Sequence, residues 1–122
     1  MNDKPQDKPQ DAIETDLLAR HCRDIAEEEG PMPDEDAQRL LGHLDDWSIV
    51  AEGQKLQRTF SFKNFYRTMS FVNALAHVVN GENHHPDLEV SYDKCTVTFW
   101  THTVGGLSEN DFICAAKVGA LV

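Results

Sequence analysis

The segment from Lys63 to Asn80 constrains the fold of this chain more than any other part of it. Its apolar residues recur every three or four positions, which predicts a helix with two apolar stripes about 110° apart around its axis. A helix with so wide an apolar arc needs two packing partners. We expect one stripe to pack on a β-sheet and the other to meet the same helix in a second copy of the chain. The sheet-facing stripe comprises Phe62, Phe65, Met69, Val72, Ala76 and Val79, and the oligomer-facing stripe comprises Phe71, Leu75 and Val78.

Two pairs of short segments with alternating apolar residues flank this helix and predict two β-hairpins. Shorter helices are predicted to start at the N-cap Asp34 and after Ser108, which forms a capping-box pattern with Asp111. The order helix, hairpin, helix, hairpin, helix predicts an α+β domain, in which a four-stranded antiparallel sheet has helices packed on one face. The predicted strands are residues 47–51, 56–62, 88–92 and 95–103.

Residues 1–33 are predicted to form an acidic, partly disordered N-terminal extension, which precedes a domain that spans residues 34–122. After Met1, residues 2–11 contain no large apolar side chain, whereas residues 12–29 have the apolar spacing of a short helix, which a Gly-Pro-Met-Pro sequence ends. Of the formal net charge of −10, residues 1–46 carry −9, from 14 acidic and 5 basic residues. Neither part of the chain offers the basic surface that nucleic acid requires, so we expect no nucleic-acid partner.

The 122 residues suffice for one domain, and no apolar stretch approaches the ~20 residues of a membrane span. The first residues lack the basic and apolar regions of a secretory signal, so we expect a cytoplasmic protein without a membrane partner. Cys22, Cys95 and Cys114 are odd in number and lack the spacing of a metal motif. We expect reduced thiols, with the last two buried.

Three histidines are placed to share one cleft, because His84 and His85 are adjacent and His102 lies on the last predicted strand. Imidazole accepts and donates protons near neutral pH, so two or three of them suit a site that transfers protons. Pro86 favours an extended backbone at His85, so the two adjacent rings should point opposite ways and have different roles. On spacing alone, the alternative is a surface loop that happens to hold two histidines, with the third a mere strand residue.

At these residues the sequence resembles the pterin-4a-carbinolamine dehydratase family. The family's pattern is His-His-Pro, an aromatic residue six positions after the Pro, a His ten positions after the aromatic, and an Asp nine positions beyond that His. This chain has His84-His85-Pro86, Tyr92, His102 and Asp111 at those positions. The strings FSFKNF at residues 60–65 and THTVGGLSENDF at residues 101–112 agree with the family too, and the resemblance covers roughly residues 34–122.

Two positions depart from the family. Asn80 stands where many members carry an ionisable residue, and Leu88 stands where some carry Trp. Asn80 can form hydrogen bonds but cannot titrate. Any carboxylate role at that position is therefore lost or passes to Glu82.

The resemblance implies an enzyme that dehydrates 4a-hydroxytetrahydropterin to quinonoid dihydropterin and water, which regenerates the pterin cofactor of an aromatic amino acid hydroxylase. The reaction requires no metal and no further cofactor. One group must protonate the departing hydroxyl while another removes a proton from the neighbouring ring nitrogen. We expect His84 and His102 to be that catalytic pair, with His85 as the third catalytic-site histidine that orients the pterin. The other expected substrate contacts are Pro86, Trp100, Thr101, Thr103 and Asp111.

Other interpretations stay open. Family relatives in animals double as dimerisation partners of a transcription factor, so the scaffold can also be a non-catalytic pterin-binding or protein-interaction module. Three histidines can also bind zinc. Asp111 is either a helix-start residue or an acid, and Trp100 either stacks on the pterin or packs in the core. The resemblance further implies a homodimer or homotetramer.

Overall fold

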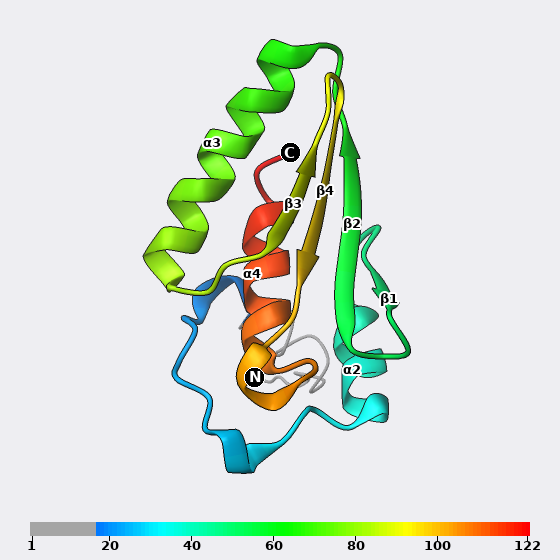
Figure 1. The fold of residues 1–122 in the computed structure, drawn as a ribbon, viewed down its shortest axis with the longest axis vertical. Coiled ribbons are helices and arrows are strands. Elements are labelled where there is room, and N and C mark those ends of the chain that lie inside the picture. The colour runs from blue at the N-terminus through cyan, green and yellow to red at the C-terminus, as the bar shows by residue number, and fades with distance from the viewer. Residues whose placement is uncertain (1–16) are drawn as a thin grey trace, which may run out of the picture.

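Two antiparallel hairpins join into one four-stranded sheet in the computed structural model, which describes residues 17–122 (Figure 1). The sheet has the order β1-β2-β4-β3, and each neighbouring pair of strands is antiparallel. Both predicted hairpins are confirmed, with strand boundaries shifted by a few residues. The strands are β1 (Ser48–Val50), β2 (Lys55–Ser61), β3 (Asp87–Val90) and β4 (Lys94–Phe99).

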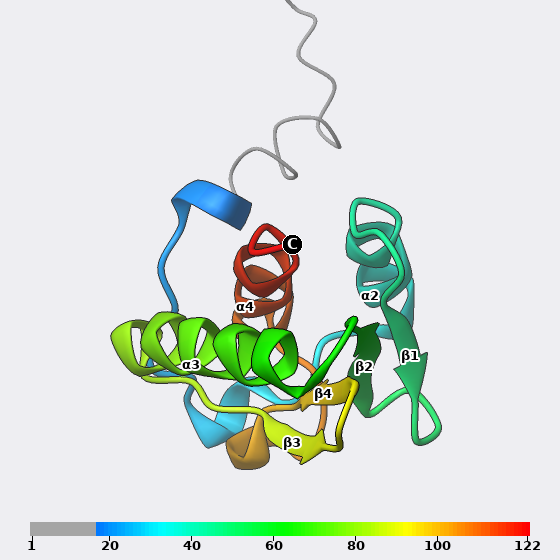
Figure 2. The same ribbon diagram turned by 90° about the horizontal axis from the view of Figure 1, so that it is seen from above.

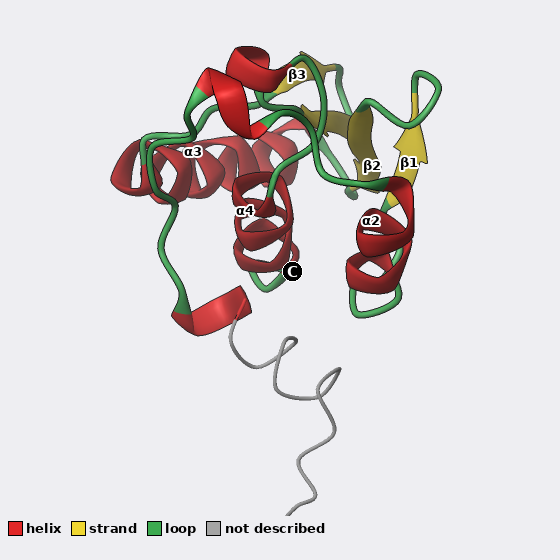
Figure 3. Ribbon diagram, turned by 90° about the horizontal axis from the view of Figure 1, so that it is seen from below, coloured by secondary structure: helices red, strands yellow, loops and turns green. Residues whose placement is uncertain are grey.

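Three helices cover one face of this sheet, namely α2 (Asp34–Leu41), α3 (Phe65–Glu82) and α4 (Glu109–Gly119). Views from above and below agree that α4 lies between α2 and α3 (Figure 2, Figure 3). Enclosed in this way, α4 has no exposed surface over the four residues 112–115. The predicted α+β class, with helices on one face of an antiparallel sheet, is confirmed.

The rotation of α3 about its axis differs from the prediction. Its buried residues are Thr68, Phe71, Leu75 and Val79. Phe71 and Leu75, expected to face a second copy of the chain, therefore belong to the core, whereas Val78 of the same stripe is half-buried. Val79 is buried, as expected for the other stripe. The Phe71 ring lies 4.5 Å from the Phe60 ring, and the Thr68 hydroxyl donates to the Tyr92 carbonyl oxygen over 3.0 Å. These contacts leave part of the other stripe at the surface: Phe65 is 47% exposed, and Met69 and Ala76 are half-buried, whereas Phe62 and Val72 pack against the core.

The last strand ends earlier than predicted. Cys95, Val97 and Phe99 alternate as buried residues, as expected, but β4 stops at Phe99. His102–Val104 form a short 3-10 helix, η3, which ends at Gly105 in the left-handed region with φ 63°. His102 therefore belongs to a turn and not to a strand face, because the chain reverses here so that residue 101 forms an isolated bridge with residue 106.

The N-terminal segment packs on the domain, although not as the predicted helix over residues 12–29. Residues 17–19 are helical and Glu27–Glu29 form the 3-10 helix η2, but residues 20–26 are not helical. The backbone N–H groups of Cys22 and Arg23 donate instead to the side chains of Glu82 and Asn110, at 2.7 Å and 3.1 Å. These tertiary hydrogen bonds replace the helical ones. The predicted disorder of residues 1–11 and the start of the predicted helix lie outside the described residues.

None of the helices within residues 17–122 combines the length and the apolar character needed to cross a bilayer.

Candidate active site

The three histidines come from two loops at one end of the sheet. His84 and His85 follow α3 and precede β3, and His102 begins η3 just after β4. Because β3 and β4 are antiparallel, with Asp87 opposite Thr98, the start of β3 lies beside the end of β4. Figure 1 shows both loops at the lower end of the sheet. The topology thus brings together residues that are separated in the sequence.

His84 is held by a buried carboxylate. Its Nε2 lies 2.6 Å from Oδ1 of Asp111, which has no exposed surface. An ionised carboxylate only accepts hydrogen bonds, so Nε2 carries the proton and Nδ1 is the ring nitrogen left for other partners when the ring is neutral. The His84 ring also lies nearly parallel to the ring of Phe99, with centroids 6.0 Å apart, and 13% of its side chain stays accessible. This arrangement fixes both the orientation and the tautomer of His84.

The carboxylate of Asp111 also caps the N-terminus of α4. Its Oδ2 accepts the backbone N–H of Ser108 over 2.9 Å and the hydroxyl of Thr101 over 2.8 Å. Ser108 and Asp111 form the predicted capping box. The sequence offered two alternatives for Asp111, and the structure shows the helix-start role together with a contact to His84 that the sequence did not indicate. Full burial also separates Asp111 from the surface, where it was expected to meet the substrate.

The backbone of the α3–β3 loop explains how His84 reaches Asp111. Asn83 ends α3 in the left-handed conformation with φ 53°, which Asn tolerates better than most residues. The N–H of His84 then donates to the carbonyl oxygen of Val79 over 3.3 Å. The chain turns back under α3 at this point, so His84 points toward the core and His85 is exposed.

His85 contacts Asn80, one of the two positions at which the sequence departs from the family. The Nε2 of His85 lies 3.0 Å from Oδ1 of Asn80, one turn earlier on α3. The amide oxygen accepts from the ring N–H, so Asn80 can orient His85 without carrying a charge. This exposed ring is positioned by a neutral partner, in contrast to His84.

Glu82 does not take over a carboxylate role beside His85. Its carboxylate accepts hydrogen bonds from Lys117 Nζ over 2.8 Å and from the Cys22 N–H over 2.7 Å, and it lies 2.8 Å from His21 Nδ1. Burial alone would raise the pKa of Glu82, but these hydrogen bonds hold it at about 2. Glu82 therefore anchors the N-terminal segment to the ends of α3 and α4.

His102 is exposed and stacks on Trp100, with ring centroids 3.8 Å apart. The indole N–H of Trp100 donates to Oδ2 of Asp87 over 3.4 Å, and Asp87 directly follows Pro86. These contacts link the His102 turn to the loop that carries the other two histidines. Trp100 is half-buried, so it supports the ring of His102 and does not pack in the core.

The two threonines beside His102 differ in exposure. Thr103 is exposed, as a substrate contact requires. Thr101 is buried, and its backbone N–H and C=O both take part in hydrogen bonds with Gly106. The reversal of the chain already uses these backbone groups, and the expected contact of Thr101 with the substrate stays a prediction.

Comparison with known proteins places this geometry in a family. Residues 30–121 match the family model described as pterin 4 alpha carbinolamine dehydratase. The chain belongs to this family. A provisionally named pterin-4-alpha-carbinolamine dehydratase from Nitrosomonas europaea is 52% identical over 106 residues, which cover 87% of this chain and 93% of that protein. A protein of the same name from Stenotrophomonas maltophilia is 61% identical over 82 residues, which cover 67% of this chain and 71% of that protein.

Two solved structures resemble this fold. A transcriptional coactivator/pterin dehydratase from Brucella melitensis has a TM-score of 0.72 and 28% identity, and covers 75% of this chain and 98% of its own. A pterin dehydratase-like protein described as a RuBisCO assembly factor in the alpha-carboxysome has a TM-score of 0.55 and 25% identity, and covers 62% of this chain and 88% of its own. The pterin dehydratase scaffold thus occurs under both enzymatic and non-enzymatic descriptions.

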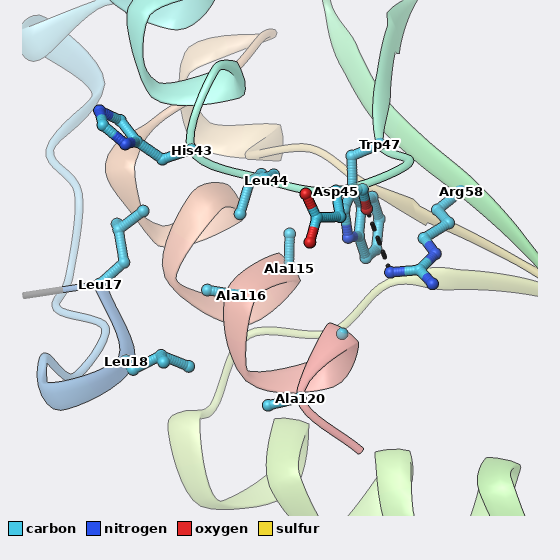
Figure 4. Close-up of a pocket in the computed structure, with 11 residues that line it drawn as sticks. Leu17, Leu18, His43, Leu44, Asp45, Trp47, Arg58, Ala115, Ala116 and Ala120 are labelled. Atoms are coloured by element: carbon cyan, nitrogen blue, oxygen red, sulfur yellow. Dashed lines mark hydrogen bonds between the residues drawn. The ribbon is translucent and has the colours of Figure 1, made fainter. Parts of the chain in front are cut away.

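A cavity of about 190 Å³ lies between α4, residues 17 and 18 of the N-terminal segment and residues 43–45 after α2 (Figure 4). Ala115 and Ala116 of α4, together with Ala120 just after its end, form one wall, with Trp47 and Arg58 at one end. None of the three candidate histidines lines it. This cavity is therefore separate from the candidate active site of the dehydratase fold.

Within residues 17–122, no group of three or more His, Cys, Asp or Glu side chains is arranged to hold a metal ion. Of the three histidines considered as zinc ligands, His84 and His85 instead direct their Nε2 atoms to Asp111 and Asn80.

Proposed function

We propose that this chain dehydrates 4a-hydroxytetrahydropterin to quinonoid dihydropterin and water by general acid–base catalysis. Membership of the family supports the substrate class. The observation that carries the chemistry is the contact between His84 and the buried Asp111, because a carboxylate behind one ring nitrogen orients the other and stabilises the charge of the imidazolium. His84 acts as the base that takes the proton from the ring nitrogen next to C4a.

His102 is the acid that protonates the departing hydroxyl. It is exposed at the same end of the sheet and stacks on Trp100, which holds the ring in place. Its exposure allows it to exchange its proton with water between turnovers. His85 lies beside Pro86 and is oriented by Asn80, so it donates or accepts a hydrogen bond to the pterin and does not transfer the proton itself.

Measured turnover of chemically made 4a-hydroxytetrahydropterin tests this function. His84→Ala and His102→Ala should each lower kcat by about 10²–10⁴-fold, since each removes one proton-transfer group. His77→Ala is the matched control, because His77 is exposed on α3, and it should leave kcat unchanged. A wild-type rate equal to the uncatalysed rate would reject the enzyme.

In the cell, we infer that an aromatic amino acid hydroxylase supplies the substrate in the cytoplasm. This inference follows from the proposed reaction, because the 4a-hydroxypterin is the form in which such a hydroxylase releases its cofactor. Co-expression with a hydroxylase tests it. The chain should sustain repeated hydroxylation at limiting pterin, and His84→Ala should not.

A protein-interaction module on the same scaffold is the second candidate. The similarity to the carboxysome protein favours it, and so does the neutral Asn80 at an otherwise ionisable position. Exposed aromatic side chains at Phe65, Tyr66 and Tyr92 offer apolar surface for such contacts. Background turnover combined with capture of a partner that depends on these aromatic residues would support this function over catalysis.

A further inference from the structure

Two cysteines that are distant in the sequence meet behind the candidate active site. The Sγ atoms of Cys22, in the non-helical segment after residue 19, and Cys114, in α4, lie 3.5 Å apart. The sequence indicated neither this pairing nor its place next to the catalytic loop. Cys114 Sγ also lies 3.9 Å from the carbonyl oxygen of His84.

We propose that Cys22 and Cys114 form a site of reversible oxidation, in which a peroxide converts the two thiols into a disulfide that ties the N-terminal segment to α4. The sulfurs are already in contact, so the bond requires them to approach by about 1.5 Å to reach the S–S length of ~2.05 Å. Segment 20–26 is not helical, so a small shift of the Cys22 side chain can supply this movement without disrupting a helix. The cross-link therefore fits the existing packing.

The different surroundings of the two thiols assign their roles. Cys22 is half-buried, so a small oxidant reaches it, whereas Cys114 has no exposed surface. The hydrogen bond with Cys22 and burial both raise the pKa of the Cys114 thiol, which suppresses its thiolate. Because the thiolate is the species that peroxide oxidises, Cys22 reacts first and Cys114 resolves the product.

The reaction balances with hydrogen peroxide as the oxidant. The Cys22 thiolate attacks one peroxide oxygen, the O–O bond breaks, and the departing hydroxide takes a proton to become water, which leaves Cys22 as a sulfenic acid. The Cys114 sulfur then attacks the Cys22 sulfur, the S–O bond breaks, and the released hydroxide combines with the Cys114 proton as a second water. Two thiols and one peroxide thus give one disulfide and two waters, and a dithiol reductant reverses the change.

The segment that becomes cross-linked already has several hydrogen bonds to the domain. Asn110 exchanges hydrogen bonds with the backbone of Arg23, at 3.1 Å and 2.7 Å, and the Arg23 guanidinium pairs with Glu109. These contacts hold Cys22 opposite Cys114 in the reduced protein, so the bridge converts an existing contact into a covalent bond. Cys22 and Cys114 are 92 positions apart, so a disulfide between them closes a long loop and restricts the unfolded chain. The thermal midpoint of unfolding should therefore rise on oxidation.

Peptide mapping of the full-length protein tests the proposal. After exposure to hydrogen peroxide and alkylation of the remaining thiols, non-reducing mass spectrometry should find a Cys22–Cys114 cross-linked peptide that has lost two hydrogens. Cys95 should be found alkylated, which shows that the peroxide left it reduced. We expect this because Cys95 is fully buried and burial raises the pKa of its thiol. Dithiothreitol should restore all three thiols and the original thermal midpoint.

Variants separate this bridge from unspecific oxidation. Cys22→Ser should abolish the cross-link and leave Cys114 reduced, whereas the matched control Cys95→Ala should keep it. The wild-type map requires no variant to fold and is decisive by itself. Oxidation of Cys22 to sulfinic acid without a bridge, or a bridge only between two molecules, would overturn the proposal.

Discussion

The Nε2 of His84 lies 2.6 Å from Oδ1 of Asp111, so one carboxylate without exposed surface joins the start of α4 to the loop after α3. The two residues are 27 positions apart in the chain. Asp111 accepts hydrogen bonds on both of its oxygens, and only one of these oxygens serves the helix. The other oxygen fixes the histidine that we propose as the base.

Asp111→Asn should therefore lower kcat by about 10²–10⁴-fold with little change in KM, because the amide cannot stabilise the imidazolium and can select the other tautomer. It should also cost about 0.5–2 kcal/mol of stability through the weakened capping box. Ser108→Ala is the control, since it removes the cap hydroxyl and keeps the contact to His84. Equal loss of kcat in both variants would assign Asp111 a structural role alone.

His85→Ala should raise KM about 3- to 10-fold, which is the effect of one lost hydrogen bond, with kcat nearly unchanged. Asn80→Leu should act in the same way, because it removes the amide that orients His85, and Asn80→Asp should retain a KM near that of the wild type. Steady-state kinetics on the three variants checks this. If His85→Ala abolished turnover while His84→Ala retained it, the assigned roles would be exchanged.

Glu82 should make folding stability depend on pH. Its pKa of about 2 in the folded protein lies below the ordinary 4.5, so its contribution is complete above about pH 4.5 and is lost as the pH falls toward 2. Solvent reaches the edge of the hydrogen-bond network around Glu82 and screens its charge, so we expect the charge to contribute about 1–2 kcal/mol to the free energy of unfolding. Glu82→Gln should lower the unfolding free energy by that amount at pH 7, and the difference from wild type should shrink at pH 3.

Urea unfolding at several pH values measures this effect. Glu28→Gln is the control, because Glu28 is exposed in η2 and should give the wild-type profile. A constant penalty for Glu82→Gln between pH 7 and pH 3 would show that its hydrogen bonds, and not its charge, stabilise the fold.

The homo-oligomer stays a prediction, but the part of α3 expected to form its interface differs from the one predicted from the sequence. Because Leu75 is 1% exposed, Leu75→Glu would bury an unpaired charge and unfold the domain. Met69→Glu, at a half-buried position on the surface side of α3, should instead leave a folded monomer, and the exposed α3 control Asn73→Glu should keep the wild-type mass. Light scattering with circular dichroism decides, and a wild-type mass near 13.8 kDa at micromolar concentration would refute the oligomer.

The sequence by itself determined the features that depend on near neighbours. Alternating apolar residues located both hairpins, and the three- and four-residue spacing located α3, because these periods follow directly from strand and helix geometry. Ser108 and Asp111 identified the start of α4, since a cap needs only residues three positions apart. The spaced His-His-Pro, Tyr, His and Asp pattern identified the family.

Only the tertiary structure decided how these elements face one another. Two apolar stripes on α3 were nearly equivalent in the sequence, and the contacts of Phe71 with β2 and of Thr68 with the turn between β3 and β4 selected the side of the helix that is buried. The partners His84–Asp111 and Cys22–Cys114 depend on the same packing. No periodic pattern encodes them, because a contact between distant residues exists only after the sheet and helices have fixed their separation and rotation.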